Sequence, residues 1–563
     1  MTRERLALPL AALAAVVALA VTSCSSSGST GSSGASGSPT APKAASAAVD
    51  YNPQPYDRVR TGGTYTTAGT FDDQGNPFDA DATLTAARIW FWYNADAITY
   101  SPTGDVQYNP DYYSHVDVKV SGGNQVVTLT INPKAVFNDG TPIDWTAIEA
   151  TWKANNGSDP KFNVSSTDGY DQITSVRPGA DAKQAVITFK GVDASWPALF
   201  STFLHPKAAT VANFNGAYLK KANPQWGAGP YTVGTWDTHS GNVTFVRNPK
   251  WWGKPGKLDK RVFVKLDSTA AVNAFRNGQI DYTATGSAEG LKQISGINGT
   301  QIRRGGSPFE YSLYLNAKSP VLSELPVRKA VLEAIDRNQV ARIEFQGLDY
   351  SEPLPGSGLL FSFQKGYQDN VSKVLSYSPA DARKELDAAG WTAGSDGIRA
   401  KNGRKLEIGY TLIGSDPLDK ALAQAFAAML KQVGVKVDIR TVDESDFSKV
   451  LSTRDFDLFL SGNRSLDPFG QRYLCQEYCS TSASNLTGTG TAELDQQIKA
   501  VSQIADLDQQ IAAANKVEQQ ELQQYAFLPL FSGPSIYAVK DGLANVGATI
   551  FGTPLPETIG WQS

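Results

Sequence analysis

The side chains with the most distinctive chemistry in this chain are its cysteines and histidines, three of each among 563 residues. Cys475 and Cys479 stand close together in Leu-Cys-Gln-Glu-Tyr-Cys. In an oxidising compartment such a pair is typical of a local disulfide. The alternative is half of a metal site, but His115, His205 and His239 are remote in sequence and lack the spacing of metal ligands. We therefore expect a disulfide and no metal.

Motifs that mark hydrolases and nucleotide-binding enzymes do not occur in the sequence. His-Glu-x-x-His and Gly-x-Ser-x-Gly are both absent, and no glycine-rich loop has the form that cradles phosphate groups. In so long a chain this argues against both classes. A catalytic triad assembled from distant residues would leave no such motif, so an enzyme of that kind stays open as an alternative. We expect no catalytic residues and no cofactor.

Cys24 stands at a sharp change in composition near the N-terminus. A short basic region and an uncharged apolar stretch over residues 6–21 precede it, and a Ser/Gly segment that cannot bury anything follows it. This order describes a secretory signal rather than a membrane-spanning helix. The junction Val21-Thr-Ser-Cys24 resembles the bacterial lipobox. The resemblance implies a signal peptide over residues 1–23 and a mature chain that begins with a lipidated Cys24.

A lipid on Cys24 would hold the protein at the outer face of the cytoplasmic membrane. The alternative, an ordinary signal peptide with an incidental cysteine, is disfavoured by the Ser/Gly tether that follows. No other uninterrupted apolar run approaches the ~20 residues that span a bilayer, so lipid alone would anchor the chain. The formal net charge of −4 is too close to neutral to indicate a nucleic-acid partner. We expect a monomer.

Composition and periodicity divide the rest of the chain. Residues 24–59 read as a flexible tether of Ser, Gly, Ala and Pro. What remains exceeds the length that one hydrophobic core supports, so two or three core units are expected. Up to about residue 300 short strands dominate, at 118–120, 126–131, 185–189 and 243–246, with a helix over 147–153.

The second half alternates strands with amphipathic helices, which predicts a βαβ-type lobe. The tail then returns to strand. The helical stretches are 328–342, 379–389, 418–433 and 493–524, and the strands are 405–412, 435–439, 456–460, 527–531 and 536–539.

Several motifs carry a resemblance to a known family. The most distinctive is the strand over 126–131 followed by Phe137-Asn-Asp-Gly-Thr-Pro142, a tight turn before a helix. The others are Asn76-Pro-Phe-Asp79, Gly227-Ala-Gly-Pro-Tyr231, Val246-Arg-Asn-Pro-Lys-Trp-Trp252, Phe275-Arg-Asn-Gly-Gln-Ile-Asp281, and Val327-Arg-Lys-Ala with Ala334-Ile-Asp-Arg337. In this order they resemble the extracytoplasmic solute-binding proteins of ABC importers, in the dipeptide, oligopeptide and nickel-binding family 5.

The resemblance implies an α/β, two-lobe periplasmic-binding-protein-like fold, large and with an extra subdomain, whose ligand cleft lies between the lobes. Residues 60–305 would form lobe I, with the subdomain at about 85–220. Residues 306–525 would form lobe II, and 526–563 would return to lobe I. The implied function is capture of di- or oligopeptides and their delivery to a permease, with permease and ATPase subunits on other polypeptides.

The resemblance also implies that a peptide ligand lies extended between two strands, one from each lobe. The first would be Thr67-Ala-Gly-Thr-Phe71, where Gly69 permits close approach of another backbone beside Thr70 and Phe71. The second would be Ser461-Gly-Asn-Arg-Ser465, which contributes Gly462, Asn463 and Arg464.

Asp467 is the acidic candidate for the ligand's α-ammonium in this second segment. The alternative is that Asp467-Pro468 is a turn. Asn463 stands where the family commonly has Trp, and Arg464 would suit a carboxylate or a sugar hydroxyl. Binding of an oligosaccharide or of a metal–chelate complex therefore stays open, as does a ligand-sensing receptor built on the same fold.

Overall fold

The computed structural model describes residues 49–69, 74–237, 239–465, 468–470, 473–482 and 484–563. These residues belong to one compact unit, 45–563. Of the predicted functional residues, Cys24, Thr70, Phe71 and Asp467 lie outside the described part, as does the side chain of Arg464.

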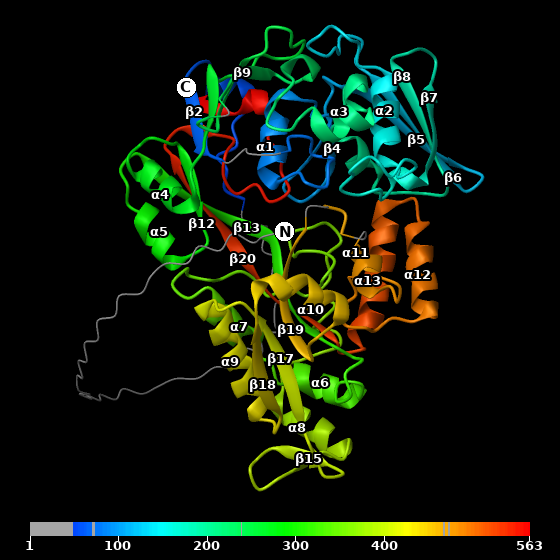
Figure 1. The fold of residues 1–563 in the computed structure, drawn as a ribbon, viewed down its shortest axis with the longest axis vertical. Coiled ribbons are helices and arrows are strands. Elements are labelled where there is room, and N and C mark those ends of the chain that lie inside the picture. Colours follow the sequence, from blue (N-terminus) through cyan, green and yellow to red (C-terminus); the bar gives the residue numbers. More distant parts are fainter. Residues whose placement is uncertain (1–48, 70–73, 238, 466–467, 471–472, 483) are drawn as a thin grey trace, which may run out of the picture. The chain divides into compact units, whose positions relative to one another are not determined.

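The central element is a mixed sheet to which both halves of the chain contribute (Figure 1). It contains both parallel and antiparallel strand pairs. Within the described residues ten strands occur in the order β18 (Lys436–Val442), β17 (Glu407–Ile413), β19 (Leu458–Arg464), β13 (Thr300–Leu315), β20 (Phe527–Lys540), β12 (Tyr282–Thr285), β2 (Thr64–Ala68), β11 (Lys260–Val264), β10 (Asn242–Arg247) and β9 (Tyr231–Asp237).

Strands β13 and β20 lie side by side as the long pair in the middle of this sheet (Figure 1). Their ladder runs from Thr300↔Lys540 to Tyr314↔Phe527 and shifts register after Gly306, which faces Pro534. Pro534 has no N–H to donate, so it is tolerated where the ladder is interrupted. The sequence predicted two tail strands, at 527–531 and 536–539, and the structure corrects this to one continuous strand.

The helices of the second half cover this sheet as the periodicity predicts. Helix α9 (Pro417–Lys431) begins at the N-cap Asp416, whose side chain accepts from the Leu418 N–H at 2.8 Å. Its buried Leu422, Phe426 and Leu430 recur at helical spacing and join the core that β17 and β13 also contribute to. The other helices packed into this core are α6 (Leu325–Glu333), α7 (Arg337–Glu344), α8 (Pro379–Ala388) and α10 (Phe447–Thr453).

Two predicted helical stretches are each two helices. The stretch 328–342 is divided between α6 and α7, because Asp336 caps α7 by accepting from the Gln339 N–H at 3.1 Å. The stretch 493–524 is divided between α12 (Ala492–Ser502) and α13 (Leu507–Leu522). Asp506 caps α13 by accepting from the Gln509 N–H at 2.9 Å. In both cases a side-chain cap marks the start of a new helix.

A second, antiparallel sheet belongs to the first half of the chain. Strand β6 alternates buried Val127, Leu129 and Ile131 with more exposed residues, so one face of this sheet is apolar. Helix α2 (Trp145–Asn155), capped by Asp144, packs against β7 and β8. The order in this sheet is β5 (Tyr113–Ser121), β6 (Asn124–Ile131), β8 (Gln184–Phe189) and β7 (Ile173–Pro178).

The segment Gly227-Ala-Gly-Pro-Tyr231 packs against the end of α1 (Leu84–Tyr93). The N–H groups of Ala228 and Gly229 both donate to the Tyr93 carbonyl, at 3.0 and 3.1 Å. A Cβ at Gly227 would lie 2.5 Å from that carbonyl oxygen, so only glycine permits this approach.

Short elements complete the described part. They are β1 (Val59–Arg60), β3 (Ile98–Tyr100), β4 (Val106–Tyr108), α3 (Val211–Gly216), α4 (Ser268–Arg276), α5 (Ala288–Ile294), β14 (Thr392–Ala393), β15 (Arg399–Lys401), β16 (Arg404–Lys405), α11 (Tyr473–Tyr478), β21 (Leu543–Ala544) and β22 (Gly560–Gln562). Over the same residues, no helix has both the length and the apolar character that crossing a membrane requires.

Candidate ligand-binding site

Strand β19, which carries three of the predicted site residues, has an open edge. On one side it pairs with β13 along its whole length, from Leu458↔Leu315 to Arg464↔Phe309. On the other side it pairs with β17 only at Leu458. Among the described residues, the second edge of 461–464 therefore has no strand partner. Backbone N–H and C=O groups along such an edge can pair with an extended chain.

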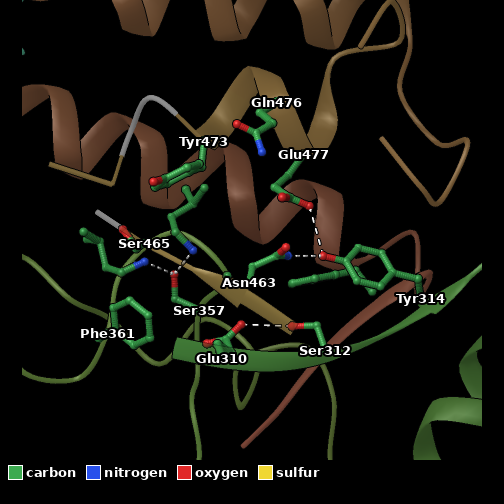
Figure 2. Close-up of a pocket in the computed structure, with 14 residues that line it drawn as sticks. Glu310, Ser312, Tyr314, Ser357, Phe361, Asn463, Ser465, Tyr473, Gln476 and Glu477 are labelled. Carbon is green, nitrogen blue, oxygen red and sulfur yellow. Dashed lines mark hydrogen bonds between the residues drawn. The ribbon is translucent and has the colours of Figure 1, made fainter. Parts of the chain in front are cut away.

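A small acidic pocket lies beside this edge, on the face that β13 and β19 share (Figure 2). Its volume is about 100 Å³. Asn463 donates to the Tyr314 hydroxyl at 2.9 Å, and this hydroxyl donates to the Glu477 carboxylate at 3.3 Å. Ser312 donates to Glu310 at 3.0 Å. The rest of the lining comes from residues 357–361, Ser465, Tyr473, Gln476 and Phe527.

Within the part of the chain that the structure describes, the two carboxyl groups of this pocket have no basic partner. The Glu310 residue is 8% exposed, and among the described residues no Lys, Arg or His forms an ion pair with Glu310 or Glu477. Burial raises the pKa of Glu310 well above its usual range, and the carboxylates of Glu518 and Glu477 act in the same direction. Burial also raises the pKa of Glu477 to about 7. The pocket can therefore switch between neutral and anionic near neutral pH.

Glu518 of α13 holds the loop that forms one wall of the pocket. Its side chain is fully buried and accepts from the Ser357 hydroxyl and the Gly358 N–H, both at 2.7 Å. It also accepts from Asn370 at 2.6 Å and from the Tyr478 hydroxyl at 3.4 Å. Burial raises the pKa of Glu518. These bonds fix the position of residues 357–361, which line the pocket.

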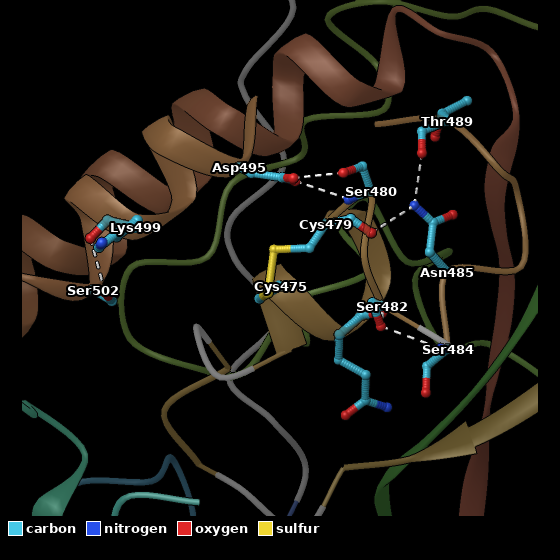
Figure 3. Close-up of a disulfide and its surroundings, with 11 residues drawn as sticks. Cys475, Cys479, Ser480, Ser482, Ser484, Asn485, Thr489, Asp495, Lys499 and Ser502 are labelled. Carbon is cyan, nitrogen blue, oxygen red and sulfur yellow. Dashed lines mark hydrogen bonds between the residues drawn. A yellow bond between two sulfur atoms is a disulfide. The ribbon is translucent and has the colours of Figure 1, made fainter. Parts of the chain in front are cut away.

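The disulfide between Cys475 and Cys479 lies at helix α11, which presents Glu477 to the pocket (Figure 3). The segment that follows the helix is also fixed, because Asn485 donates to the Cys479 carbonyl at 3.2 Å. Asp495 accepts from the Ser480 N–H at 2.8 Å. The cross-link and these bonds hold a six-residue helix whose own hydrogen bonds would be too few to keep it formed.

A second, larger cavity of about 540 Å³ lies at the end of β2. Arg261 forms part of its wall and is stacked on aromatic rings, 3.7 Å from the Phe263 centroid and 4.2 Å from that of Tyr65. Arg261 also donates to the Thr67 hydroxyl at 2.6 Å, and burial lowers the pKa of its guanidinium to about 10. Arg261 therefore stabilises β2 through its hydrogen bond to Thr67 and its stacking on Tyr65.

One hydrogen bond joins a residue that lines the acidic pocket to a residue that lines the larger cavity. The Ser465 N–H, from the acidic pocket, donates at 2.9 Å to the carbonyl of Pro308, which lines the larger cavity. Pro308 stands in β13 where the ladder with β20 is interrupted. A ligand at the edge of β19 would therefore lie next to both cavities.

Comparison with known proteins identifies the family. The description "Bacterial extracellular solute-binding proteins, family 5 Middle" matches residues 106–485, two thirds of the chain. The oligopeptide-binding protein OppA of Mycobacterium tuberculosis H37Rv is 34% identical over 460 residues, which cover 80% of this chain and 76% of that protein. This chain belongs to the family 5 extracellular solute-binding proteins. The resemblance found in the sequence is confirmed.

Solved structures of family 5 type have the same fold. The periplasmic EDTA-binding protein EppA superimposes with a TM-score of 0.78 at 22% identity, over 93% of this chain and 100% of that one. The oligopeptide-binding protein AppA of Bacillus subtilis, solved in complex with a nonapeptide, gives 0.67 at 17% identity, over 90% and 100%. These matches confirm the two-lobe α/β fold. Proteins of this family bind solutes outside the cytoplasm and work with the permease components of ABC importers.

The predicted site residues of this family 5 protein fall in two places. Gly69 lines the larger cavity, while Asn463 lines the acidic pocket. Strands β13, β20 and β12 stand between β2 and β19 in the sheet. The Gly69 N–H already donates to Val264 at 2.9 Å, and a Cβ there would lie 3.0 Å from the Phe263 ring. The close neighbour of this glycine is thus an aromatic side chain.

Gly462 is required by the packing of β13. A Cβ at Gly462 would lie 2.6 Å from the Phe309 ring and 2.9 Å from that of Tyr311. Phe309 and Tyr311 therefore cover the face of β19 at this residue. The neighbouring Asn463 stands opposite Glu310 in the register, which brings the acidic pocket beside the open edge.

Sequence reasoning missed the residues that make the pocket acidic. Glu310 interrupts the run Phe-Glu-Tyr-Ser-Leu-Tyr, where a carboxyl group inside an otherwise strand-like segment is a detectable signal. Glu477 stands between the two cysteines. Nothing in the sequence indicates that these two residues meet, because the contact depends on strand register.

Proposed function

We propose that this protein captures peptides outside the cytoplasm and delivers them to the permease of an ABC importer. The open edge of β19 over 461–464 is the observation that carries the proposal. An extended peptide added to this edge is held by its backbone, so affinity does not depend on one particular side chain. The relative that binds oligopeptides supports the same assignment.

The predicted site residues have distinct parts in this proposal. Gly462, Asn463 and Arg464 supply the backbone groups that pair with the ligand, and Asp467 follows them as a candidate for the ligand's amino terminus. Gly69, Thr70 and Phe71 bound the cleft from the other lobe. The protein itself catalyses no reaction and acts as a monomer, and the permease and ATPase subunits are separate polypeptides.

Methylation of ligand amides tests the strand pairing. Successive N–H groups of a strand point to opposite sides, so only alternate residues of a bound tetrapeptide donate to β19. A tetra-alanine peptide is N-methylated at the alternate residues that face β19. We expect this peptide to bind residues 49–563 at least tenfold more weakly than the unmethylated one. The reason is the loss of two hydrogen bonds to β19, each of ~1 kcal/mol. Calorimetry measures the affinities.

The other alternate set of N-methyl groups is the matched control and should change affinity less than threefold. Equal affinity for both methylated sets would contradict strand pairing. Oligosaccharides and metal–chelate complexes are screened in parallel by thermal shift, since a ligand at a hundred times its Kd stabilises the folded state by ~2.7 kcal/mol. Stabilisation by these classes alone would rule out the peptide assignment.

We further propose that a lipid on Cys24 holds the protein at the outer face of the cytoplasmic membrane, with residues 1–23 removed. The tether that the sequence predicted over 24–59 would end before Asp50, because Asp50 pairs with Ala548 and Val59 pairs with Gln562. Replacement of Cys24 by alanine in the full chain should move the protein from the membrane fraction to the soluble fraction and abolish labelling by palmitate. Fractionation with immunoblotting measures this. The control, Cys475→Ala with Cys479→Ala, should stay in the membrane. A Cys24→Ala protein that stays membrane-bound would refute the lipid anchor.

The domain limits are proposed as the sequence suggested them. Lobe I comprises residues 60–305, with a subdomain at about 85–220, and lobe II comprises 306–525. The tail, 526–563, returns to lobe I. Two contacts support this assignment of the tail: β20 pairs with β12, and β22 pairs with β1 at Val59↔Gln562.

A further inference from the structure

The acidic pocket has features that the capture of a peptide backbone does not require. Backbone pairing along β19 needs no charged group, yet two carboxyl groups face one cavity, and neither forms an ion pair with a basic side chain among the described residues. Glu310 comes from β13 and Glu477 from α11, so the pair is built by segments far apart in the sequence. Only Ser312 and Tyr314 donate to these carboxyl groups within the described part of the chain.

We propose that this pocket binds the ammonium group of a basic ligand side chain, so that the protein selects peptides containing lysine or a lysine-like residue. The inference rests on the proposed function, because it places the peptide on the edge of β19. Without this pocket the site would recognise only the peptide backbone. With it, the site also recognises one class of side chain.

The position of the pocket indicates a side chain rather than a chain end. Glu310, Ser312 and Tyr314 are alternate residues of β13 and therefore point to one face of the sheet. Asn463, opposite Glu310 in the register, lines the pocket from β19. Alternate side chains of a ligand strand beside β19 would point to this same face. A lysine side chain can cross one strand spacing of ~4.8 Å and reach the pocket.

The size and chemistry of the pocket fit an ammonium group. A volume of about 100 Å³ holds roughly three groups of the size of a water molecule. An ammonium ion is a compact charge with three donors and no acceptor, whereas guanidinium is larger and has five donors. In the view of Figure 2 the Asn463 side chain lies between Glu310, which comes from β13, and Glu477, which comes from helix α11. Their oxygens give a bound ammonium several acceptors.

Among the described residues, the charged groups near Glu310 do not supply a cation that pairs with it. Besides burial, the carboxylates of Glu518 and Glu477 raise the pKa of Glu310, and Arg337 lowers it. Arg337 uses its guanidinium on the carbonyls of residues 355 and 529, at 2.6 and 2.9 Å. Binding of a ligand cation would therefore be the event that stabilises both carboxylates in their ionised form.

The test compares lysine with its neutral isostere norleucine. Lysine is placed in turn at each position of an N-acetylated tetra-alanine peptide, and calorimetry measures binding to residues 49–563 at pH 7.5. We expect one position at which lysine binds at least tenfold more tightly than norleucine. Glu310→Gln with Glu477→Gln should reduce this ratio to about one. The control Glu407→Gln, a partly exposed carboxylate on β17 that pairs with Lys436, should leave the ratio unchanged.

The pH dependence gives a second readout. An ammonium binds the ionised carboxylates, so protons held by Glu310 and Glu477 must leave when lysine binds. Below the Glu477 pKa of about 7, release of the Glu477 proton alone should cost the lysine peptide about tenfold in affinity per pH unit, and the norleucine peptide should show no such loss.

Three outcomes overturn the inference. The first is equal affinity for lysine and norleucine at every position. The second is a preference that the double variant, folded as judged by circular dichroism, retains in full. The third is an amine preference that appears only in unacetylated peptides, which would assign the pocket to the ligand's amino terminus. If instead no tetrapeptide binds, whether acetylated or with a free amino terminus, the proposed function itself fails.

Discussion

Replacement of Glu518 by alanine should lower the free energy of unfolding by about 3–5 kcal/mol, the range for removing one member of a buried polar network. Glu518 is fully buried and accepts four hydrogen bonds, from Ser357, Gly358, Asn370 and Tyr478. Alanine would leave these donors without an acceptor and would create a cavity beside α13, where the carboxyl group now lies. Urea denaturation followed by tryptophan fluorescence measures the change.

Gln520, exposed on the same helix, supplies the control. Gln520→Ala should change stability by less than ~0.5 kcal/mol, since surface substitutions outside special features rarely do more. Glu518→Gln keeps the volume but replaces one acceptor oxygen by an NH2 group, so its loss should be intermediate. Equal stabilities of the Glu518→Ala and Gln520→Ala proteins would show that the network contributes little.

Replacement of Arg303 by methionine should free the C-terminal segment from β13. Arg303 is 1% exposed and donates to the carbonyl of Leu543, at 2.7 Å, and to that of Val546. Methionine fills much of the volume but donates nothing. Two buried carbonyls without donors cost roughly 2–6 kcal/mol together. Hydrogen exchange should therefore accelerate over residues 541–563, and the midpoint of urea unfolding should fall.

The control for this substitution is Arg276→Met, at an exposed position of α4. It should leave exchange over 541–563 unchanged. The same experiment addresses the proposed domain limits, because a tail that belongs to lobe I should loosen without faster exchange in α9 or β18. Faster exchange in those elements, or none in the tail, would argue against this assignment of the tail.

Local signals in the sequence were sufficient for many single elements. Pro417 and Asp416 mark the start of α9, and the alternation of Val127, Leu129 and Ile131 marks β6. The breaks between α6 and α7 and between α12 and α13 carried a readable signal too. Asp336 and Asp506 are each followed three residues later by Gln, the pattern of a capped helix start. In both cases the helical periodicity continues on either side of the break, so the sequence predicted one continuous helix.

The candidate site was predictable only in part. The strand with Gly462 and Asn463 was found, because apolar residues followed by Gly and polar residues indicate a strand that reaches a cleft. The partners Glu310, Glu477 and Ser357 were not, because they come from three segments joined only by sheet register and by the side chain of Glu518. Register over such distances depends on all intervening pairings, which no local pattern specifies.

The place of β20 in the sheet has a consequence for how this protein is made. It is the last long strand of the chain, yet it pairs with β13 on one side and with β12 on the other. A chain that is exported N-terminus first therefore exposes the edges of both neighbours until residues 527–540 have crossed the membrane. Unpaired strand edges are prone to aggregation. Folding of the central sheet must wait for the end of export, so a chain cut short before Phe527 would reach the outside without its middle strand.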